Sequence, residues 1–115
     1  MTSNNKYDEN LAKNKANYTE LTPLSFLERT ARVFPHKTAI IHGSIKMSWL
    51  ETYKRCIKLA SALTKKGIRK GDTVAMMLPN VPTGIEAHFG VPMSGAVLNA
   101  LNIRLDAKTI AFILD

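Results

Sequence analysis

The sequence predicts an α/β fold in which helices pack on a mainly parallel sheet. The first observation is a continuous apolar run of strand length, Val74–Leu78, which ends at Pro79. A strand that is apolar on both faces belongs inside a covered, parallel sheet. The second observation is a helical segment followed by another short apolar run, Ala96–Leu98. A strand, a helix and a strand in this order predict a parallel βαβ unit.

Composition places the chain among soluble globular proteins. It has 115 residues, 45% hydrophobic and 22% charged, which is enough for one domain. No apolar run approaches the ~20 residues that span a bilayer, and the first twenty residues contain no apolar stretch typical of a secretory signal. Cys56 is the single cysteine, which excludes an internal disulfide and fits a reducing compartment. We therefore expect a cytoplasmic protein without an integral membrane segment.

The net charge of +7 leaves two interpretations open. The longest basic cluster, residues 65–70, falls where a helix is predicted to end, and lysines there complement the negative end of the helix dipole. The other basic residues are spread along the chain, so we favour a solvated surface and no nucleic-acid partner. The alternative is a free-standing basic α/β interaction module that binds an anionic surface or nucleic acid.

The N-terminal residues differ in composition from the rest. Residues 1–20 are polar and rich in asparagine, which predicts a disordered or loosely docked tail. Residues 21–115 then form the folded part. The first helix begins with Thr22 as the cap and Pro23 as its first residue, and it ends before Pro35. Its expected apolar stripe is Phe26, Leu27, Thr30 and Val33 or Phe34.

A β-hairpin is expected next. Residues 37–42 and 45–47 read as strands, and Gly43-Ser44 between them is the sequence that a type II′ turn requires. A second helix follows, with Ser48 and Glu51 as a capping box and Gly67 as its left-handed end. Its expected buried stripe is Leu50, Tyr53, Ile57, Ala60 and Leu63, with Lys54, Arg55, Lys58 and Lys65 on the solvent side.

The central helix of the βαβ unit carries unusual residues. We expect Asn80 to cap it, Pro82 to be its first residue and Gly95 to close it, and Pro92 to kink or weaken it. A last helix is capped by Asp106 and has an apolar face of Ile110, Ile113 and Leu114. No stop signal follows that helix, so the domain is expected to be truncated within it.

No residue pattern identifies a catalytic or metal site. His36, His42 and His88 lack the spacing of metal ligands, so structural or solvent roles are favoured for them. Cys56 could be a nucleophile, but a small core residue is the favoured interpretation. The start of the helix near Pro82 could hold an anion, yet the loop before it has no glycine, and neither Gly-x-Gly-x-x-Gly nor Gly-x-x-x-x-Gly-Lys-Ser/Thr occurs.

Several short motifs together resemble the AMP-forming acyl-CoA synthetases, members of the adenylate-forming superfamily. They are Asn-Tyr-Thr at 17–19, Leu-Thr-Pro-Leu-Ser-Phe-Leu-Glu-Arg at 21–29, Lys-Gly-Asp-Thr-Val-Ala at 70–75, Leu-Pro-Asn at 78–80 and Gly-Ala-Val-Leu-Asn-x-Leu-Asn-x-Arg-Leu at 95–105. The opening motifs look most like the fatty or medium-chain acid branch. The resemblance covers residues 17–115 and identifies them as part of the AMP-binding domain of such an enzyme.

This resemblance implies a reaction but no site residues. In the family, a carboxylate attacks the α-phosphate of MgATP, and the thiol of coenzyme A then displaces AMP from the acyl-adenylate. The resemblance places the phosphate loop and the catalytic lysine downstream of residue 115, so no catalytic, cofactor-binding or metal residue is assigned. Arg104 is expected to be structural. The chain alone is expected to be inactive and to bind no cofactor, and an enzyme that passes its adenylate to another acceptor is a third possibility.

Overall fold

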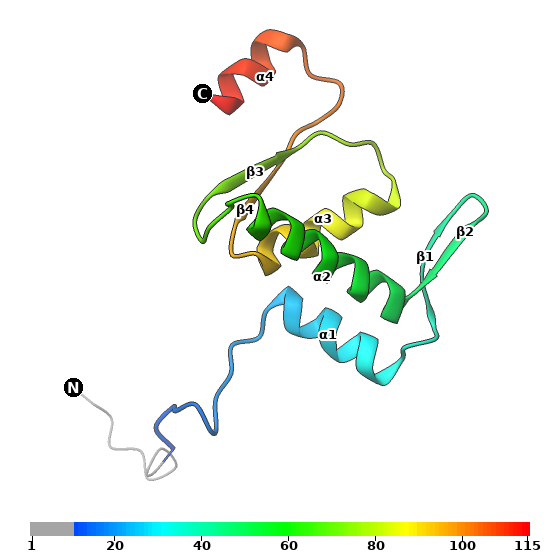
Figure 1. Ribbon diagram of the computed structural model, residues 1–115, viewed down its shortest axis with the longest axis vertical. Coiled ribbons are helices and arrows are strands. Elements are labelled where there is room, and N and C mark those ends of the chain that lie inside the picture. Colours follow the sequence, from blue (N-terminus) through cyan, green and yellow to red (C-terminus); the bar gives the residue numbers. More distant parts are fainter. Residues whose placement is uncertain (1–10) are drawn as a thin grey trace.

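The computed structural model describes residues 11–115, and its elements follow the predicted order. Along the chain they are α1 (Pro23–Val33), β1 (Thr38–His42), β2 (Ile45–Ser48), α2 (Trp49–Lys65), β3 (Thr73–Met76), α3 (Pro82–Met93), β4 (Val97–Ala100) and α4 (Ala107–Leu114) (Figure 1). The predicted α/β class is confirmed. Half of the expected 1–20 tail lies outside the described residues, and residues 11–20 are exposed, so the boundary at residue 21 stays a prediction.

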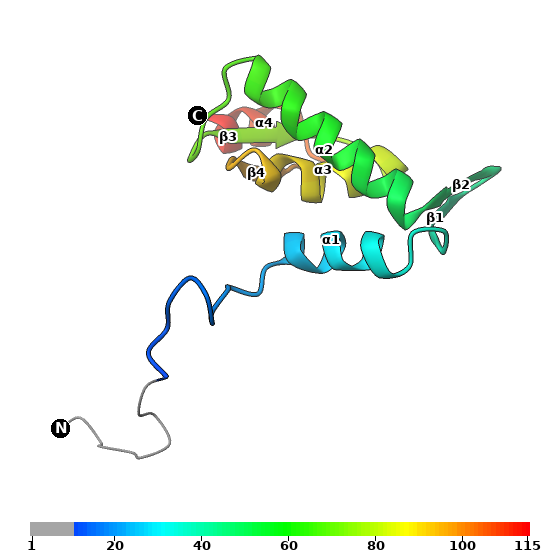
Figure 2. The same ribbon diagram turned by 60° about the horizontal axis from the view of Figure 1, so that its bottom comes forward.

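Helix α1 begins as predicted but buries a different face. The Thr22 Oγ1 accepts a hydrogen bond from the Ser25 N–H at 3.2 Å, and the Ser25 Oγ accepts one from the Thr22 N–H at 3.1 Å. Its buried residues are Leu27 and Ala31. The expected stripe was correct at Leu27 and wrong at Phe26, Val33 and Phe34, which are 56%, 51% and 43% exposed. Helix α1 lies below α2 and α3 in Figure 2 and packs on both, so only one narrow line of its surface is covered.

The hairpin is confirmed, with β1 and β2 paired antiparallel. Gly43 has φ +58°, the positive value that the first position of a primed hairpin turn requires. The register shifts between Thr38 and Ile40, and Ile40 is the buried residue of β1. The hairpin projects from the helices and the β3–β4 sheet (Figure 1), and its contacts with the rest of the structure are mainly with α2.

Both ends of α2 form as the sequence predicts. The Ser48 Oγ accepts from the Glu51 N–H at 3.2 Å, and the Glu51 Oε2 accepts from the Ser48 N–H at 2.8 Å. The Glu51 carboxylate also accepts from the Ser48 hydroxyl at 2.7 Å, and the bonds it accepts from the Ser48 N–H and hydroxyl lower the pKa of the Glu51 carboxyl. At the other end Gly67 has φ +96°, and the Ile68 N–H donates to the Leu63 carbonyl at 3.1 Å. This is the hydrogen-bond pattern of a Schellman motif.

The buried line of α2 meets the predicted stripe at Leu63 but lies one position away from it in the first half of the helix. Thr52 and Cys56 are the buried residues, and Leu59 and Leu63 continue the line toward the core. Ile57, expected inside, is 44% exposed. The reason is that α2 packs most extensively on α3, and this neighbour determines which face of the amphipathic helix is covered.

Strands β3 and β4 form the predicted parallel pair. Thr73 is opposite Val97, and the register continues without a shift to Met76 opposite Ala100. The inner face packs on a core of Ala87, Val91 and Ala96. The expectation of burial on both faces was wrong for the described residues, because Val97 on the other face is 56% exposed. In the part of the chain that the structure describes, this sheet has two strands, and residues of α2 and α3 pack on its inner face.

Helix α3 begins at Pro82 as predicted, but its cap differs from the prediction. Its N-cap is Val81, with no side-chain hydrogen bond, so the assignment of Asn80 as the cap was wrong. The helix runs through Pro92 to Met93. Because Pro92 lies in the last turn, almost no helix follows it that a kink could redirect. The expected weakening of the helix therefore falls at its end. Gly95 follows with φ +85°, as predicted.

Helix α4 is capped by Asp106, whose carboxylate accepts from the Lys108 N–H at 3.0 Å and the Thr109 N–H at 3.1 Å. Hydrogen bonds to Thr109 lower the pKa of Asp106. None of the residues of α4 is buried, and the helix stands apart from α1, α2 and α3 in Figure 1. Its predicted apolar face is therefore largely uncovered.

The close crossing of α2 and α3 at Gly90 generates a prediction. A Cβ at Gly90 would lie 2.8 Å from the Leu59 Cδ2 and 3.0 Å from the Cys56 carbonyl oxygen, whereas one at Gly84 would lie 3.7 Å from its nearest neighbour. We expect Gly90→Ala to lower the free energy of unfolding by about 1–3 kcal/mol through overpacking. Gly84→Ala, on the same helix, should be neutral or stabilising by up to about 1 kcal/mol. Urea unfolding followed by circular dichroism measures both, and equal effects would contradict the close crossing.

Candidate functional site

The most specific polar contact of the chain joins α2 to α3. The Arg55 guanidinium donates through Nε to the Glu86 Oε1 and through Nη2 to the Glu86 Oε2, the second at 3.1 Å. The Glu86 side chain is 6% exposed and the Arg55 side chain 54%. The carboxylate raises the pKa of Arg55, mainly through the hydrogen bond. This bidentate pair therefore satisfies a buried charge and fixes the position of α3 on α2.

The sequence contained a signal for this contact. The segment from Thr73 to Ile103 contains no Asp, Lys or Arg, and Glu86 is the single glutamate within this segment. A lone acidic residue in such a stretch is either exposed or paired. Arg55 was assigned to the solvent side, and it is indeed more than half exposed, but its guanidinium reaches the buried carboxylate. Sequence spacing alone gives no indication of a partner 31 residues away.

Cys56 occupies the same interface and is fully buried. Burial, reinforced by the nearby Glu86 carboxylate, raises the pKa of the Cys56 thiol to about 11. At neutral pH the sulfur is therefore protonated, and a thiol is a poor nucleophile. The interpretation of Cys56 as a small core residue is the one that this geometry supports.

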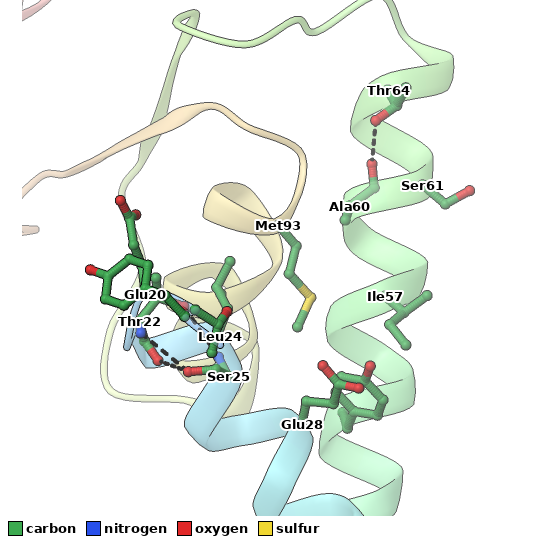
Figure 3. Close-up of a pocket in the computed structure, with 13 residues that line it drawn as sticks. Glu20, Thr22, Leu24, Ser25, Glu28, Ile57, Ala60, Ser61, Thr64 and Met93 are labelled. Atoms are coloured by element: carbon green, nitrogen blue, oxygen red, sulfur yellow. Dashed lines mark hydrogen bonds between the residues drawn. The ribbon is translucent and has the colours of Figure 1, made fainter. Parts of the chain in front are cut away.

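An open groove of about 930 Å³ lies between α2 and the segment that leads into α1 (Figure 3). Glu28 on α1 and Ile57 on α2 line its two sides, and Met93 from the end of α3 lies between them. Glu20 is a second carboxylate of the lining, and none of the lining residues is Lys, Arg or His. A groove with two carboxylates and no cation does not suit a triphosphate.

A smaller hollow of about 290 Å³ lies beyond the carboxyl end of β3, between β1 and the first turns of α3. It brings together His42 and His88, which the sequence did not connect. The His88 Nδ1 is 2.7 Å from the Gly84 carbonyl oxygen. Both histidines are exposed, and so is His36 in the loop before β1. Residues 11–115 contain no group of three or more potential metal ligands.

The start of α3 offers little to an anion. Pro82, its first residue, has no N–H, and the Gly84 N–H already donates to the Val81 carbonyl at 2.9 Å. The basic residues at positions 65, 66, 69 and 70 are exposed around the end of α2. Arg104 is exposed in the loop before α4, where its backbone N–H donates to the Asn102 Oδ1 at 2.9 Å. None of these features forms a phosphate cradle, so the described residues do not fit MgATP or coenzyme A.

Comparison with known proteins identifies the family that has these motifs and this fold. The family model described as AMP-binding enzyme matches residues 27–115. The chain belongs to this family. In the part of this AMP-binding chain that is described, no helix combines the length and hydropathy that a membrane span needs.

Two relatives of this AMP-binding chain are named as acid–CoA ligases. It is 59% identical over 106 residues to an acetate–CoA ligase of Humulus lupulus, covering 92% of this chain and 19% of the relative. It is 57% identical over 107 residues to a peroxisomal acetate/butyrate–CoA ligase of Arabidopsis thaliana, covering 93% and 19%. The chain thus spans about a fifth of the length of these relatives.

Solved structures agree with the family and the fold. A putative long-chain-fatty-acid CoA ligase from Rhodopseudomonas palustris superimposes with a TM-score of 0.78 at 34% identity, covering 83% of this chain and 24% of that one. The prediction of an N-terminal portion of an adenylate-forming enzyme, with a helix, a hairpin, a helix and a parallel βαβ unit, is confirmed.

The Arg55–Glu86 pair should contribute more than the surface pair of α1. We expect Arg55→Met to lower the free energy of unfolding by about 2–3 kcal/mol, because it leaves a buried carboxylate unpaired. The loss is smaller than for a fully buried pair, since solvent already screens the half-exposed Arg55 side chain. Arg32→Met is the matched control. Arg32 pairs with Glu28 at 2.8 Å, with side chains 78% and 51% exposed, and its loss should cost no more than about 0.5 kcal/mol. Urea midpoints compare the two, and similar losses would contradict a structural role for Glu86.

Proposed function

We propose that this chain is the N-terminal portion of an AMP-forming acid–CoA ligase. In that reaction a carboxylate attacks the α-phosphate of ATP and releases pyrophosphate, and the thiol of coenzyme A then takes the acyl group and releases AMP. The observation that carries the proposal is the 59% identity over 106 residues to an acetate–CoA ligase. The partners of the complete enzyme are accordingly a carboxylic acid, MgATP and coenzyme A.

The chain alone is proposed to be inactive. The groove between α2 and the segment that leads into α1 has no cation in its lining, the start of α3 has few free N–H groups, and the sequence contains no glycine-rich phosphate loop. The hollow that Arg55 and Lys58 line also contains the Glu86 carboxylate, which already accepts from Arg55. Stabilising the transferred phosphoryl group requires such donors or a metal ion. This chain supplies scaffold residues, and the reacting groups are proposed to come from the rest of a ligase.

The acid is proposed to be an aliphatic carboxylate. The two relatives described above carry acetate and butyrate in their names, while the fatty or medium-chain branch that the opening motifs resemble points to longer acids. A role in fatty acid metabolism follows only for the longer acids. A chain-length series from acetate to decanoate is therefore the informative set of substrates.

A cytoplasmic location remains our proposal, although the Arabidopsis relative is peroxisomal by name. Fluorescence microscopy of the tagged complete gene product distinguishes the two compartments. The alternative of a basic interaction module rests on the +7 charge alone. It requires binding to nucleic acid or anionic vesicles at low salt that weakens steeply as salt rises, and we expect none.

A chimera tests the proposed function directly. The matched fifth of the Humulus acetate–CoA ligase is replaced by residues 11–115 of this chain, and acid-dependent pyrophosphate release is measured over the chain-length series. We expect the chimera to keep activity within about tenfold of the parent on at least one acid, and we expect the chain alone to release none.

The control is the parent ligase without its matched fifth, which should be inactive. A soluble chimera that activates no acid would contradict the proposed function. Acid-dependent AMP formation by the chain alone would contradict only its inactivity.

A further inference from the structure

The hollow beyond the carboxyl end of β3 brings together two imidazoles from separate elements. His42 follows the buried Ile40 by two residues, and alternate residues of a strand share a face, so His42 lies on the face of β1 that borders this hollow. His88 shares one side of α3 with Gly84 and Ile85, which line the same hollow. The two histidines are far apart in the sequence, so the fold is what makes them neighbours.

The hydrogen bond of His88 determines which ring nitrogen carries the proton. A carbonyl oxygen can only accept, so the His88 Nδ1–H donates to the Gly84 carbonyl oxygen, 2.7 Å away. The Nε2 of the neutral ring therefore has a free lone pair. Metal-binding histidines are commonly oriented in this way, with one ring nitrogen donating to a backbone carbonyl and the other bound to the ion. His88 is thus held in the tautomer that a metal ion requires.

The surroundings of the two rings suit a transition-metal ion. Both histidines are exposed, so an ion and its water ligands can enter from solvent. Among the described residues that line the hollow, none is Lys or Arg, so no fixed positive charge repels a cation there. None of them is Asp or Glu either, and carboxylates are the ligands that Mg²⁺ and Ca²⁺ prefer. Imidazole nitrogens instead suit ions such as Zn²⁺ and Cu²⁺.

We propose that His42 and His88 together bind one divalent transition-metal ion through their imidazole nitrogens, with water completing the coordination. Two protein ligands are fewer than the four of a structural zinc site, so the ion exchanges readily with solution. The hairpin contacts the rest of the structure mainly through α2, and an ion shared by β1 and α3 attaches it to a second helix. This inference goes beyond the proposed function, and its test is independent of the ligase reaction.

Titration of the 115-residue chain with Zn²⁺ tests the site. His42→Gln and His88→Gln each remove one imidazole. His36→Gln is the matched control, because His36 lies in the loop before β1 and does not line the hollow. Met76→Leu is a second control, since it changes the lining without removing an imidazole. Calorimetric titration gives the stoichiometry and the dissociation constant, and NMR spectra of the imidazole nitrogens identify the ligating atoms.

We expect one Zn²⁺ per parent chain, with a dissociation constant at least tenfold higher in His42→Gln and in His88→Gln and unchanged in both controls. Binding to the parent should weaken at least tenfold between about pH 7.5 and about pH 5.5, because Zn²⁺ binds the neutral imidazole and histidines in general take up protons in this range. Zn²⁺ should shift the resonance of the His88 Nε2 and leave its Nδ1 protonated. Saturating Zn²⁺ should raise the thermal unfolding midpoint of the parent and not that of the His42 or His88 variant.

A parent chain that binds Zn²⁺ no more tightly than His42→Gln would overturn the proposal, as would an equal loss of affinity in His36→Gln or in Met76→Leu. The same titration in urea, at a concentration that unfolds the chain, tests whether the fold creates the site. We expect the affinity of the parent to fall there to that of His42→Gln, because unfolding separates β1 from α3. An affinity that urea leaves unchanged would also overturn the proposal.

Discussion

The fold depends on how closely α3 approaches α2. Gly90 is buried where the two helices meet, and a Cβ at this position would lie 2.8 Å from the Leu59 Cδ2 and 3.0 Å from the Cys56 carbonyl oxygen, closer than side-chain carbons normally pack. This contact fixes two other arrangements. The near end of α2 carries the hairpin, and α3 supports β3 and β4 through the core residues Ala87 and Val91. A shift at the crossing would therefore move the hairpin relative to the sheet, because both are attached to this pair of helices.

The same interface combines close packing with a buried charge. Glu86 lies one helical turn before Gly90, so the ion pair with Arg55 and the glycine contact act on one face of α3. Apolar contacts favour burial without specifying an alignment, whereas a bidentate pair is satisfied in only one arrangement of the helices. Desolvating Glu86 offsets much of the gain, so its contribution is to the alignment of α2 and α3 more than to net stability.

The sequence predicted what short-range chemistry determines. The capping box at Ser48, the glycine end of α2 at Gly67 and the turn at Gly43 all formed, because each depends on residues within a few positions of one another. The buried stripe of α2 could not be predicted, since its apolar residues cover more than one face and α3 selects Cys56 over Ile57. For the same reason the sequence predicted neither the Arg55–Glu86 contact nor the hollow that His42 and His88 line. They join segments that are close only in the folded chain.

The charge pattern explains why the sheet looked more buried than it is. A stretch of 31 residues, Thr73–Ile103, contains one charged side chain, and natural sequences place such stretches where both faces avoid water. Here α2 and α3 cover one face, while Val97 and Met77 remain half exposed on the other face and at the edge. The apolar composition therefore predicted more burial than residues 11–115 provide for this sheet.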